Sequence, residues 1–288
     1  IYILFPHYSM TNRSRENRLN ELSAKEWLRF TKTWFVHNPP PRKKNELLHP
    51  AKYPEKLVEE FIRFFTKPGQ LVFDPFLGTG STLIAAHNAG RNGLGIELLE
   101  KYAQIARERL QGLDNQLQLD DSGAKQHCQQ LVIQGDATTI ESIWQKHRLP
   151  LVDFVMTSPP YGPMLTKKGL VSKEREAKGL DVKYSDEAAD LGNVASFEAF
   201  VERLVSIFLS VKDIMQPGAH LVIILKNYMD KGEYKTLAWD VGKALGKHFQ
   251  LRGEKLWCQD NKTLYPYGYR YSFVPNVHHH YCLIFKKQ

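Results

Sequence analysis

From about Gln70 to its end, the sequence alternates short β-rich runs with stretches of helical periodicity. Seven β-rich runs predict strands, at 70–74, 93–97, 131–134, 151–157, 219–226, 250–258 and 278–286. Helical patterns separate most of them, at 80–89, 98–111, 138–147, 197–215 and 234–247. This alternation is typical of an α/β fold, a doubly wound sheet whose strands are mostly parallel.

Composition bounds the class of protein. A chain of 288 residues with 42% hydrophobic content can bury a sizeable core. No apolar run approaches the roughly 18 residues that span a bilayer. The three cysteines, Cys128, Cys258 and Cys282, form no CxxC pair, which argues against a disulfide framework and a cysteine zinc site. We therefore expect a soluble, cytoplasmic protein with no membrane partner and no metal.

The charge balance favours a polyanionic partner. Lysine and arginine number 39 against 31 acidic residues, which gives a formal net charge of +8. Such an excess suits nucleic acid, although a basic enzyme without such a partner is equally compatible with it.

Two segments stand outside the alternation. Residues 1–45 form a basic N-terminal arm with a helical patch at 24–34 and a proline run, "PPPRKK", that must be extended. The arm carries Arg13, Arg15 and Arg18. Residues 162–195 form a long polar insert in which Lys167, Lys168 and Lys173 precede an acid-rich stretch. A solvated loop and a DNA-contacting loop both fit this insert.

The turn "DPFLGTGST", residues 74–82, follows the first strand of the alternation. It lacks the third glycine of the nicotinamide motif G-x-G-x-x-G and the lysine of a P-loop. Gly78 and Gly80 let the backbone approach a ligand closely. An acid at the strand end, Asp74, would repel a pyrophosphate but pairs well with a cationic amino group. The turn therefore favours S-adenosylmethionine.

Two later acids fit the same ligand. Glu97 ends the next predicted strand, where a carboxylate can accept hydrogen bonds from both ribose hydroxyls. Asp136 follows the third strand, where it can accept from an adenine amino group. Three acids on successive strand ends beside one glycine turn predict a single ligand cleft.

The next strand ends in "TSPPY", residues 157–161. With this motif the chain resembles the amino-group DNA methyltransferases, whose fourth motif reads Asp, Asn or Ser, then Pro-Pro, then an aromatic residue. "DPFLGTGST" resembles their first motif, "GIEL" their second and "GDA" their third. "HPAKYPEKLVEEFIRFF" resembles the segment that precedes the first motif and helps to close the methionine pocket. The resemblance covers about residues 46–288.

The resemblance implies a seven-stranded, Rossmann-like methyltransferase fold with an antiparallel last strand, built by a catalytic domain at 46–288. The implied cofactor is S-adenosylmethionine, and the implied partner is double-stranded DNA, with a cognate restriction endonuclease left open. The implied cofactor-binding residues are His49, Tyr53, Asp74, Pro75, Phe76, Gly78, Gly80, Ser81, Thr82, Glu97, Asp136 and Ala137. The implied catalytic residues are Ser158, Pro159, Pro160 and Tyr161. We expect DNA contacts from Lys167, Lys168, Lys173, Tyr267 and Arg270.

The catalytic residue types fit methylation of an exocyclic amine, whose lone pair is delocalised into the base. Ser158 Oγ and the Pro159 carbonyl can accept its hydrogens, and Tyr161 can stack on a base flipped out of the duplex. Alignment against a sulfonium donor needs neither a strong base nor a metal.

Ser158, in place of Asp or Asn, resembles the cytosine N4 members more than the adenine N6 members. An adenine N6 enzyme, an RNA guanine N2 methyltransferase and a catalytically silent nucleic-acid-binding subunit are the alternatives.

Two clusters near the C-terminus admit both a functional and a structural interpretation. Residues 261–276 place five aromatic residues at period two, which fits either stacking platforms for bases or a packed hairpin. The run His278-His279-His280 resembles a metal site, but on a strand the middle imidazole points away from the other two, so we expect a structural role.

Overall fold

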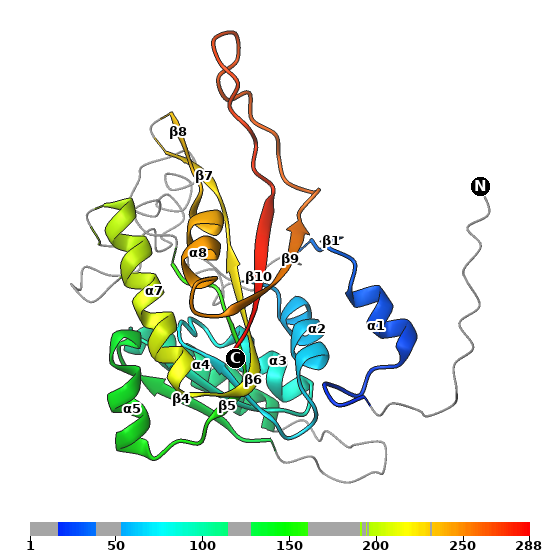
Figure 1. Ribbon diagram of the computed structural model, residues 1–288, viewed down its shortest axis with the longest axis vertical. Helices are drawn as coiled ribbons and strands as arrows, with labels where there is room; N and C mark the ends of the chain where they lie inside the picture. Colours follow the sequence, from blue (N-terminus) through cyan, green and yellow to red (C-terminus); the bar gives the residue numbers. More distant parts are fainter. Residues whose placement is uncertain are drawn as a thin grey trace.

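A computed structural model describes residues 17–38, 53–114, 128–160, 191, 194, 196–230 and 232–288. Its central element is an eight-stranded sheet in the order β1-β9-β10-β6-β5-β2-β3-β4 (Figure 1). The strands are β1 (Trp34–Val36), β2 (Leu71–Asp74), β3 (Asn92–Glu97), β4 (Gln130–Gln134), β5 (Val152–Thr157), β6 (Met215–Leu225), β9 (Gln250–Cys258) and β10 (His279–Lys286). A separate hairpin pairs β7 (Tyr228–Asp230) with β8 (Glu233–Lys235).

Strand direction confirms the predicted fold class. β10 pairs antiparallel with β6 and with β9, and every other pair in the large sheet is parallel. The predicted count of seven strands is wrong, because β1 adds an eighth at the edge of β9. β1 is three residues long and half exposed, too short to show an alternating pattern in the sequence.

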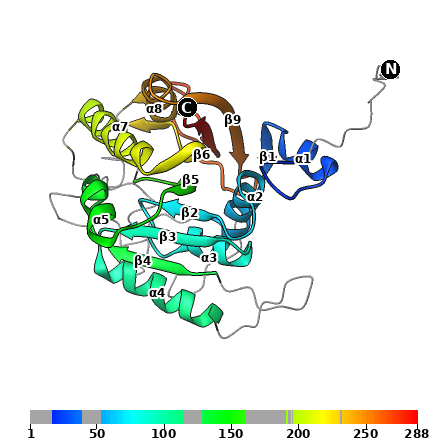
Figure 2. The ribbon, with the colours of Figure 1, turned by 60° about the horizontal axis from the view of Figure 1, so that its bottom comes forward.

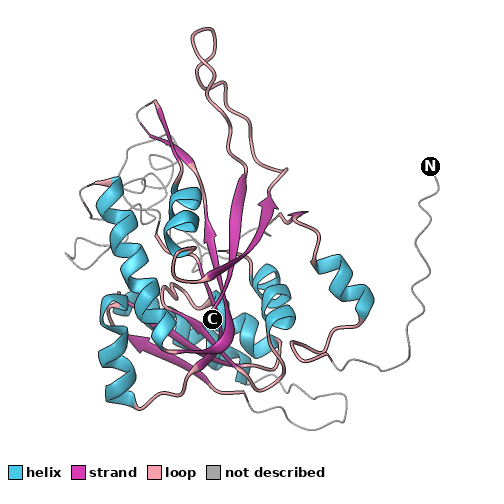
Figure 3. Cartoon of the chain, viewed as in Figure 1, coloured by secondary structure: helices cyan, strands magenta, loops and turns pink. Residues whose placement is uncertain are grey.

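Helices cover both faces of the sheet (Figures 2 and 3). They are α2 (Glu55–Phe65), α3 (Ser81–Asn88), α4 (Glu100–Asp114), α5 (Ile140–His147), α7 (Phe197–Asp213) and α8 (Leu237–Leu245). A further helix, α1 (Ala24–Phe30), lies to one side of the molecule, beyond α2 (Figure 2). A short 3-10 turn, η2 (Ala137–Thr139), precedes α5. The predicted helical patch at 24–34 ends earlier, at Phe30, and β6 begins earlier than predicted. Within the described ranges, no helix combines the length and apolarity needed to cross a membrane.

Alternation along the central strands divides the core into two layers. Phe73, Val155 and Ile223 face α5, α7 and α8. Their neighbours Val72 and Phe154 face α2 and α3 on the other side. Side chains that alternate across a sheet must be apolar on both faces when helices cover both, which explains the continuous apolar runs of β5 and β6.

Residues 17–38 pack against α2. The Asn20 amide donates to the carbonyl of Phe64 at 2.5 Å, and the Phe30 ring stacks on the Phe64 ring with centroids 4.0 Å apart. Lys255, on β9, donates its ammonium to the carbonyls of Phe30 and Lys32. The described part of the N-terminal arm is thus joined to the main sheet by apolar and polar contacts.

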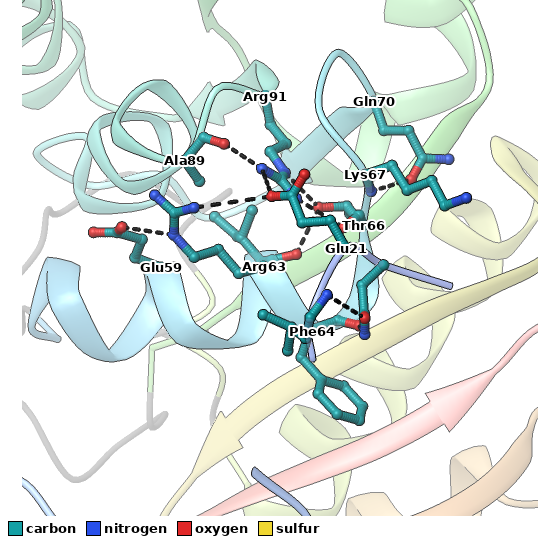
Figure 4. A network of polar contacts seen from close by, with 12 residues as sticks. Glu21, Glu59, Arg63, Phe64, Thr66, Lys67, Gln70, Ala89 and Arg91 are labelled. Carbon is teal, nitrogen blue, oxygen red and sulfur yellow. Dashed lines mark hydrogen bonds and ion pairs between the residues drawn. The ribbon is translucent and has the colours of Figure 1, made fainter. Parts of the chain in front are cut away.

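A buried arginine joins three separate segments (Figure 4). Arg91 is 1% exposed. Its guanidinium donates to the Thr66 hydroxyl at 3.1 Å and the Thr66 carbonyl at 2.9 Å, and also to the Ala89 carbonyl. It forms an ion pair with Glu21 at 3.0 Å. Burial lowers the pKa of Arg91, and Glu21 opposes that shift. Arg91 therefore donates hydrogen bonds to the carbonyls at the ends of α2 and α3, and its ion pair with Glu21 anchors the N-terminal segment.

Replacing Arg91 with Met should lower the free energy of unfolding by about 3–5 kcal/mol, because two buried carbonyls and the Glu21 carboxylate lose their donor. Glu21→Gln should cost only about 0–1 kcal/mol, because Glu21 is itself 42% exposed. Urea unfolding followed by circular dichroism measures both. Equal stabilities for the two variants would contradict the anchoring role.

Candidate functional site

The glycine turn lies between β2 and α3 and is shaped by two residues of positive φ. Gly78 has φ 56° and Gly80, the N-cap of α3, has φ 88°. A Cβ on Gly80 would lie 3.0 Å from the Cβ of Ala106, on α4. Conformation and space therefore both require glycine at position 80.

The Asp74 carboxylate lies at the centre of the site and is completely buried. Oδ1 accepts from the Thr157 hydroxyl at 2.6 Å and from the Phe76 amide at 3.0 Å. Oδ2 accepts from the Tyr53 hydroxyl at 2.6 Å and from the Thr82 hydroxyl. The carboxylate thus connects β2, α3, β5 and the segment before α2.

These partners bear on the role that the sequence suggested for Asp74. Burial raises the pKa of this carboxyl, and the four donated hydrogen bonds act in the opposite direction. Because each oxygen already accepts two hydrogen bonds, both pairs of lone pairs are occupied. The geometry indicates that Asp74 organises the turn, and its direct pairing with a cationic amino group stays a prediction.

Glu97 joins the end of β3 to the glycine turn. Its Oε2 accepts from the Gly78 amide at 2.7 Å and its Oε1 from the Leu99 amide at 3.0 Å. The side chain is 9% exposed. These contacts fix the orientation of the carboxylate against the turn.

Asp136 is half-buried and caps η2, with Oδ1 accepting from the Thr138 amide at 2.8 Å. Strand register places it near the other acids, because Asp74 pairs with Gly95 and Glu97 pairs with Gln134. The carboxyl ends of β2, β3 and β4 therefore bring the three predicted acids to one edge of the sheet.

The remaining predicted cofactor residues in the described ranges surround the same turn. Ala137, Pro75, Ser81 and Thr82 are buried and Phe76 is half-buried. Among the described residues, the buried Ser81 Oγ has no hydrogen-bond partner. An unpaired buried hydroxyl in the first turn of α3 fits a polar ligand at this position.

The Ser-Pro-Pro turn follows β5, the strand next to β2. Ser158 and Pro160 are half-buried and Pro159 is buried. Thr157, immediately before Ser158, holds Asp74 through the 2.6 Å hydrogen bond. The structure therefore places the predicted catalytic turn beside the predicted cofactor turn.

Several predicted residues lie outside the described residues. They are Tyr161 of the catalytic set, His49 of the cofactor set, and Lys167, Lys168 and Lys173 of the DNA set. Most of the insert at 162–195 lies outside the described residues as well.

The aromatic segment between β9 and β10 projects from the body of the molecule as a long hairpin arm (Figure 1). Turns replace the period-two strand at its tip, where the amides of Tyr271 and Ser272 both donate to the Gly268 carbonyl. Tyr271 is 94% exposed and Phe273 is 89% exposed, so these rings do not pack in the core. The predicted residues Tyr267 and Arg270 are exposed on the same arm.

The histidine run has structural contacts. His280 stacks on Trp257 with ring centroids 4.5 Å apart, and His279 contacts the Tyr281 hydroxyl at 3.3 Å. Among the residues that the structure describes, no three His, Cys, Asp or Glu side chains gather as a metal site.

Comparison with known proteins finds similarity to DNA methyltransferases. Residues 4–108 match the family model N6_N4_Mtase, described as DNA methylase. The type II methyltransferase M.BglI of Bacillus subtilis is 35% identical over 92 residues, which is 32% of this chain and 26% of M.BglI. The type II methyltransferase M2.DpnII of Streptococcus pneumoniae is 43% identical over 63 residues, 22% of this chain and 24% of M2.DpnII. Over these residues the chain is similar to the amino-group DNA methyltransferases.

The matched stretch spans only about a quarter of the length of these two family members. Among solved structures, TrmN from Thermus thermophilus is 15% identical with a TM-score of 0.47, covering 81% of this chain and 48% of TrmN. The magnesium protoporphyrin IX methyltransferase ChlM from Synechocystis PCC 6803, solved with bound SAM, is 14% identical with a TM-score of 0.41, covering 77% of this chain and 71% of ChlM.

Thr157→Val should lower the free energy of unfolding by about 1.5–3 kcal/mol, because it removes a hydroxyl that donates to a buried carboxylate. The matched control Thr138→Val changes an exposed threonine and should stay within about 0.5 kcal/mol of the parent protein. Chemical unfolding compares the two. A Thr157→Val protein as stable as the Thr138→Val control would contradict the central structural role of Asp74.

Proposed function

We propose that the protein transfers a methyl group from S-adenosylmethionine to an exocyclic amine of a base in double-stranded DNA. The observation that carries this proposal is the hydrogen bond between Thr157 and Asp74. It joins the turn suited to a cofactor with the turn suited to an amine, on neighbouring parallel strands. A methyl donor and its acceptor held at one sheet edge need little further alignment.

The residues present fit the cofactor. Gly78 and Gly80 open the turn to a ligand, and the unpaired Ser81 hydroxyl in the first turn of α3 offers a polar contact. We assign Glu97 to the ribose hydroxyls and Asp136 to the adenine amino group, because both carboxylates are oriented at the carboxyl edge by backbone amides. The bound cofactor would supply a methyl group activated by its sulfonium.

In this proposal Asp74 is a positioning residue. Its carboxylate fixes Thr82, at the start of α3, and Thr157, before Ser158, relative to each other. It acts on the cofactor through the shape of the glycine turn.

Ser158 and Pro159 would act on the amine. The Ser158 hydroxyl and the Pro159 carbonyl accept its two hydrogens, which localises the nitrogen lone pair towards the methyl carbon. The bound cofactor would supply its methyl group to this nitrogen and be left as a neutral thioether, and the proton released from the amine would pass to water. Orientation supplies most of the rate enhancement, so the site needs no strong base.

Cytosine N4 is the proposed acceptor. In the family that the chain resembles, the adenine N6 enzymes more often carry Asp or Asn at the position of Ser158. Adenine N6 is the second candidate, supported by the same turn.

The exposed hairpin arm supports DNA as the partner. Tyr267 and Arg270 lie on it with the exposed rings of Tyr271 and Phe273. Aromatic faces beside a guanidinium suit bases and phosphates. We also propose that Lys167, Lys168 and Lys173 contact phosphate.

Glu97→Gln should weaken cofactor binding about 10- to 100-fold. A glutamine side chain has only one acceptor oxygen, so it cannot accept hydrogen bonds from the Gly78 amide, the Leu99 amide and the ribose hydroxyls together. Glu100→Gln removes a nearby exposed carboxylate on α4 and serves as the matched control. Titration calorimetry with S-adenosylmethionine measures both affinities. Unchanged affinity in a folded Glu97→Gln protein would refute the ribose assignment.

Ser158→Ala should lower kcat at least about 10-fold while leaving cofactor affinity unchanged, because the lost hydrogen bond acts on the nucleophile. Ser210→Ala, on the exposed face of α7, is the control. Labelled cofactor with DNA and with RNA separates the substrates, and mass spectrometry of digested product identifies the base.

The product distinguishes the candidate functions. N4-methylcytosine is expected. N6-methyladenine would overturn the cytosine assignment alone, and methylation of RNA guanine would overturn the DNA assignment. An absence of transfer despite cofactor and DNA binding would indicate a catalytically silent subunit.

A further inference from the structure

A cavity of about 650 Å³ opens beyond the end of β6, between that strand and the base of the hairpin arm. Two lysines, Lys226 and Lys262, line it together with His278. The other lining residues are Tyr228, Met229, Asn261, Thr263, Tyr265, Tyr267, Val274, Pro275, Asn276 and Val277. Among the described residues, the lining therefore contains cations, hydrogen-bond donors and aromatic rings, and no carboxylate.

The cavity lies on the same sheet edge as the proposed catalytic turn. Thr157 pairs with Ile223 on the adjacent parallel strand β6, and Lys226 is three residues beyond Ile223. Three strand residues span ~10 Å and neighbouring strands lie about 4.8 Å apart. Lys226 is thus separated from the Ser158 turn by roughly the length of a nucleotide from base to phosphate.

Lys226 is half-buried, and in the described part of the chain its ammonium has no hydrogen bond or ion pair. Burial lowers its pKa to about 8, and Lys262 adds to the shift. Burial and both lysines also lower the pKa of His278. An anion in the cavity would offset both the lost hydration of Lys226 and the repulsion between the lysines.

We propose that this cavity binds a phosphodiester of the DNA strand that carries the target base, with Lys226 as its cationic ligand. The inference rests on the proposed function for the identity of the strand. The ring of Tyr267, on the cavity wall, would pack beside the sugar or an adjacent base, while Asn261 offers a further donor. Lys226 would position the strand, and Ser158 would act on the base.

A neutral base acceptor is the weaker partner for this site. A formal anion gains more from a partly desolvated ammonium than a carbonyl or ring nitrogen does, since charge-assisted hydrogen bonds are about twice as strong as neutral ones. A second lysine in the same cavity raises the positive potential without adding a directional base contact.

The test compares Lys226→Gln with Lys226→Arg and with Lys243→Gln. Lys243 is an exposed lysine in the last turn of α8, which leads to the start of β9 at the opposite sheet edge. Binding of duplex DNA is measured over a range of salt concentrations. Lys226→Gln should reduce the log–log salt slope by about one, whereas the other two variants should keep the parent slope. The KM of Lys226→Gln for DNA should rise, while its kcat at saturating DNA should stay nearly unchanged.

A second measurement leaves the protein unaltered. A duplex with one neutral methylphosphonate beside the methylated base should show the same loss of slope with the parent protein, and no additional loss with Lys226→Gln. Competition with inorganic phosphate separates the phosphodiester from a free anion: weak competition is expected, and displacement of DNA by millimolar phosphate would assign the cavity to a free anion instead.

An unchanged slope in Lys226→Gln, or a fall in kcat alone, would overturn the phosphodiester assignment. Failure of the proposed function would give a different result. The parent protein would then bind DNA without methylating it, and the salt slopes of the variants could still be compared with the slope of the parent protein.

Discussion

A buried carboxylate determines the geometry on which the rest of the site depends. Placing Asp74 out of water costs several kcal/mol unless donors replace the lost hydration. Tyr53, Thr82, Thr157 and the Phe76 amide supply them. Because Tyr53 and Thr157 come from distant parts of the chain while Phe76 and Thr82 belong to the turn itself, satisfying one charge also fixes the glycine turn, α3 and the end of β5 relative to one another.

The candidate functional groups gather at one edge of the sheet. The three acids, the Ser-Pro-Pro turn and the lysine-lined cavity all lie at the carboxyl ends of parallel strands, where open α/β sheets bind ligands. The antiparallel β10 extends this edge, because its first residues and the hairpin arm before it rise beside the end of β6. The antiparallel strand thus builds a cavity wall next to the proposed methyl-transfer site.

The Arg91 network stabilises a different part of the molecule, where the N-terminal segment meets α2 and α3. Residues 17–38 offer α2 an aromatic surface. The C-terminal ends of α2 and α3 beside this surface need polar partners for their buried carbonyls. Arg91 provides several donors from one planar group, and so satisfies carbonyls that no regular hydrogen-bond ladder reaches. Burial of this cation is tolerated because Glu21 and the carbonyls surround it.

The sequence by itself determined the alternation of strands and helices and showed a resemblance to one family, because hydrophobic periodicity and short motifs are local properties. The antiparallel last strand was an expectation that this resemblance implied. The sequence also predicted that Asp74, Glu97 and Asp136 meet at one edge, because parallel strands end together. Only the tertiary structure decided what these groups touch. The donors to Asp74 come from positions up to 83 residues away, the strand at Trp34–Val36 exists because β9 has a free edge, and Lys226 faces a cavity formed by a distant hairpin. Such contacts depend on which segments the fold brings together, and no local pattern of residues encodes them.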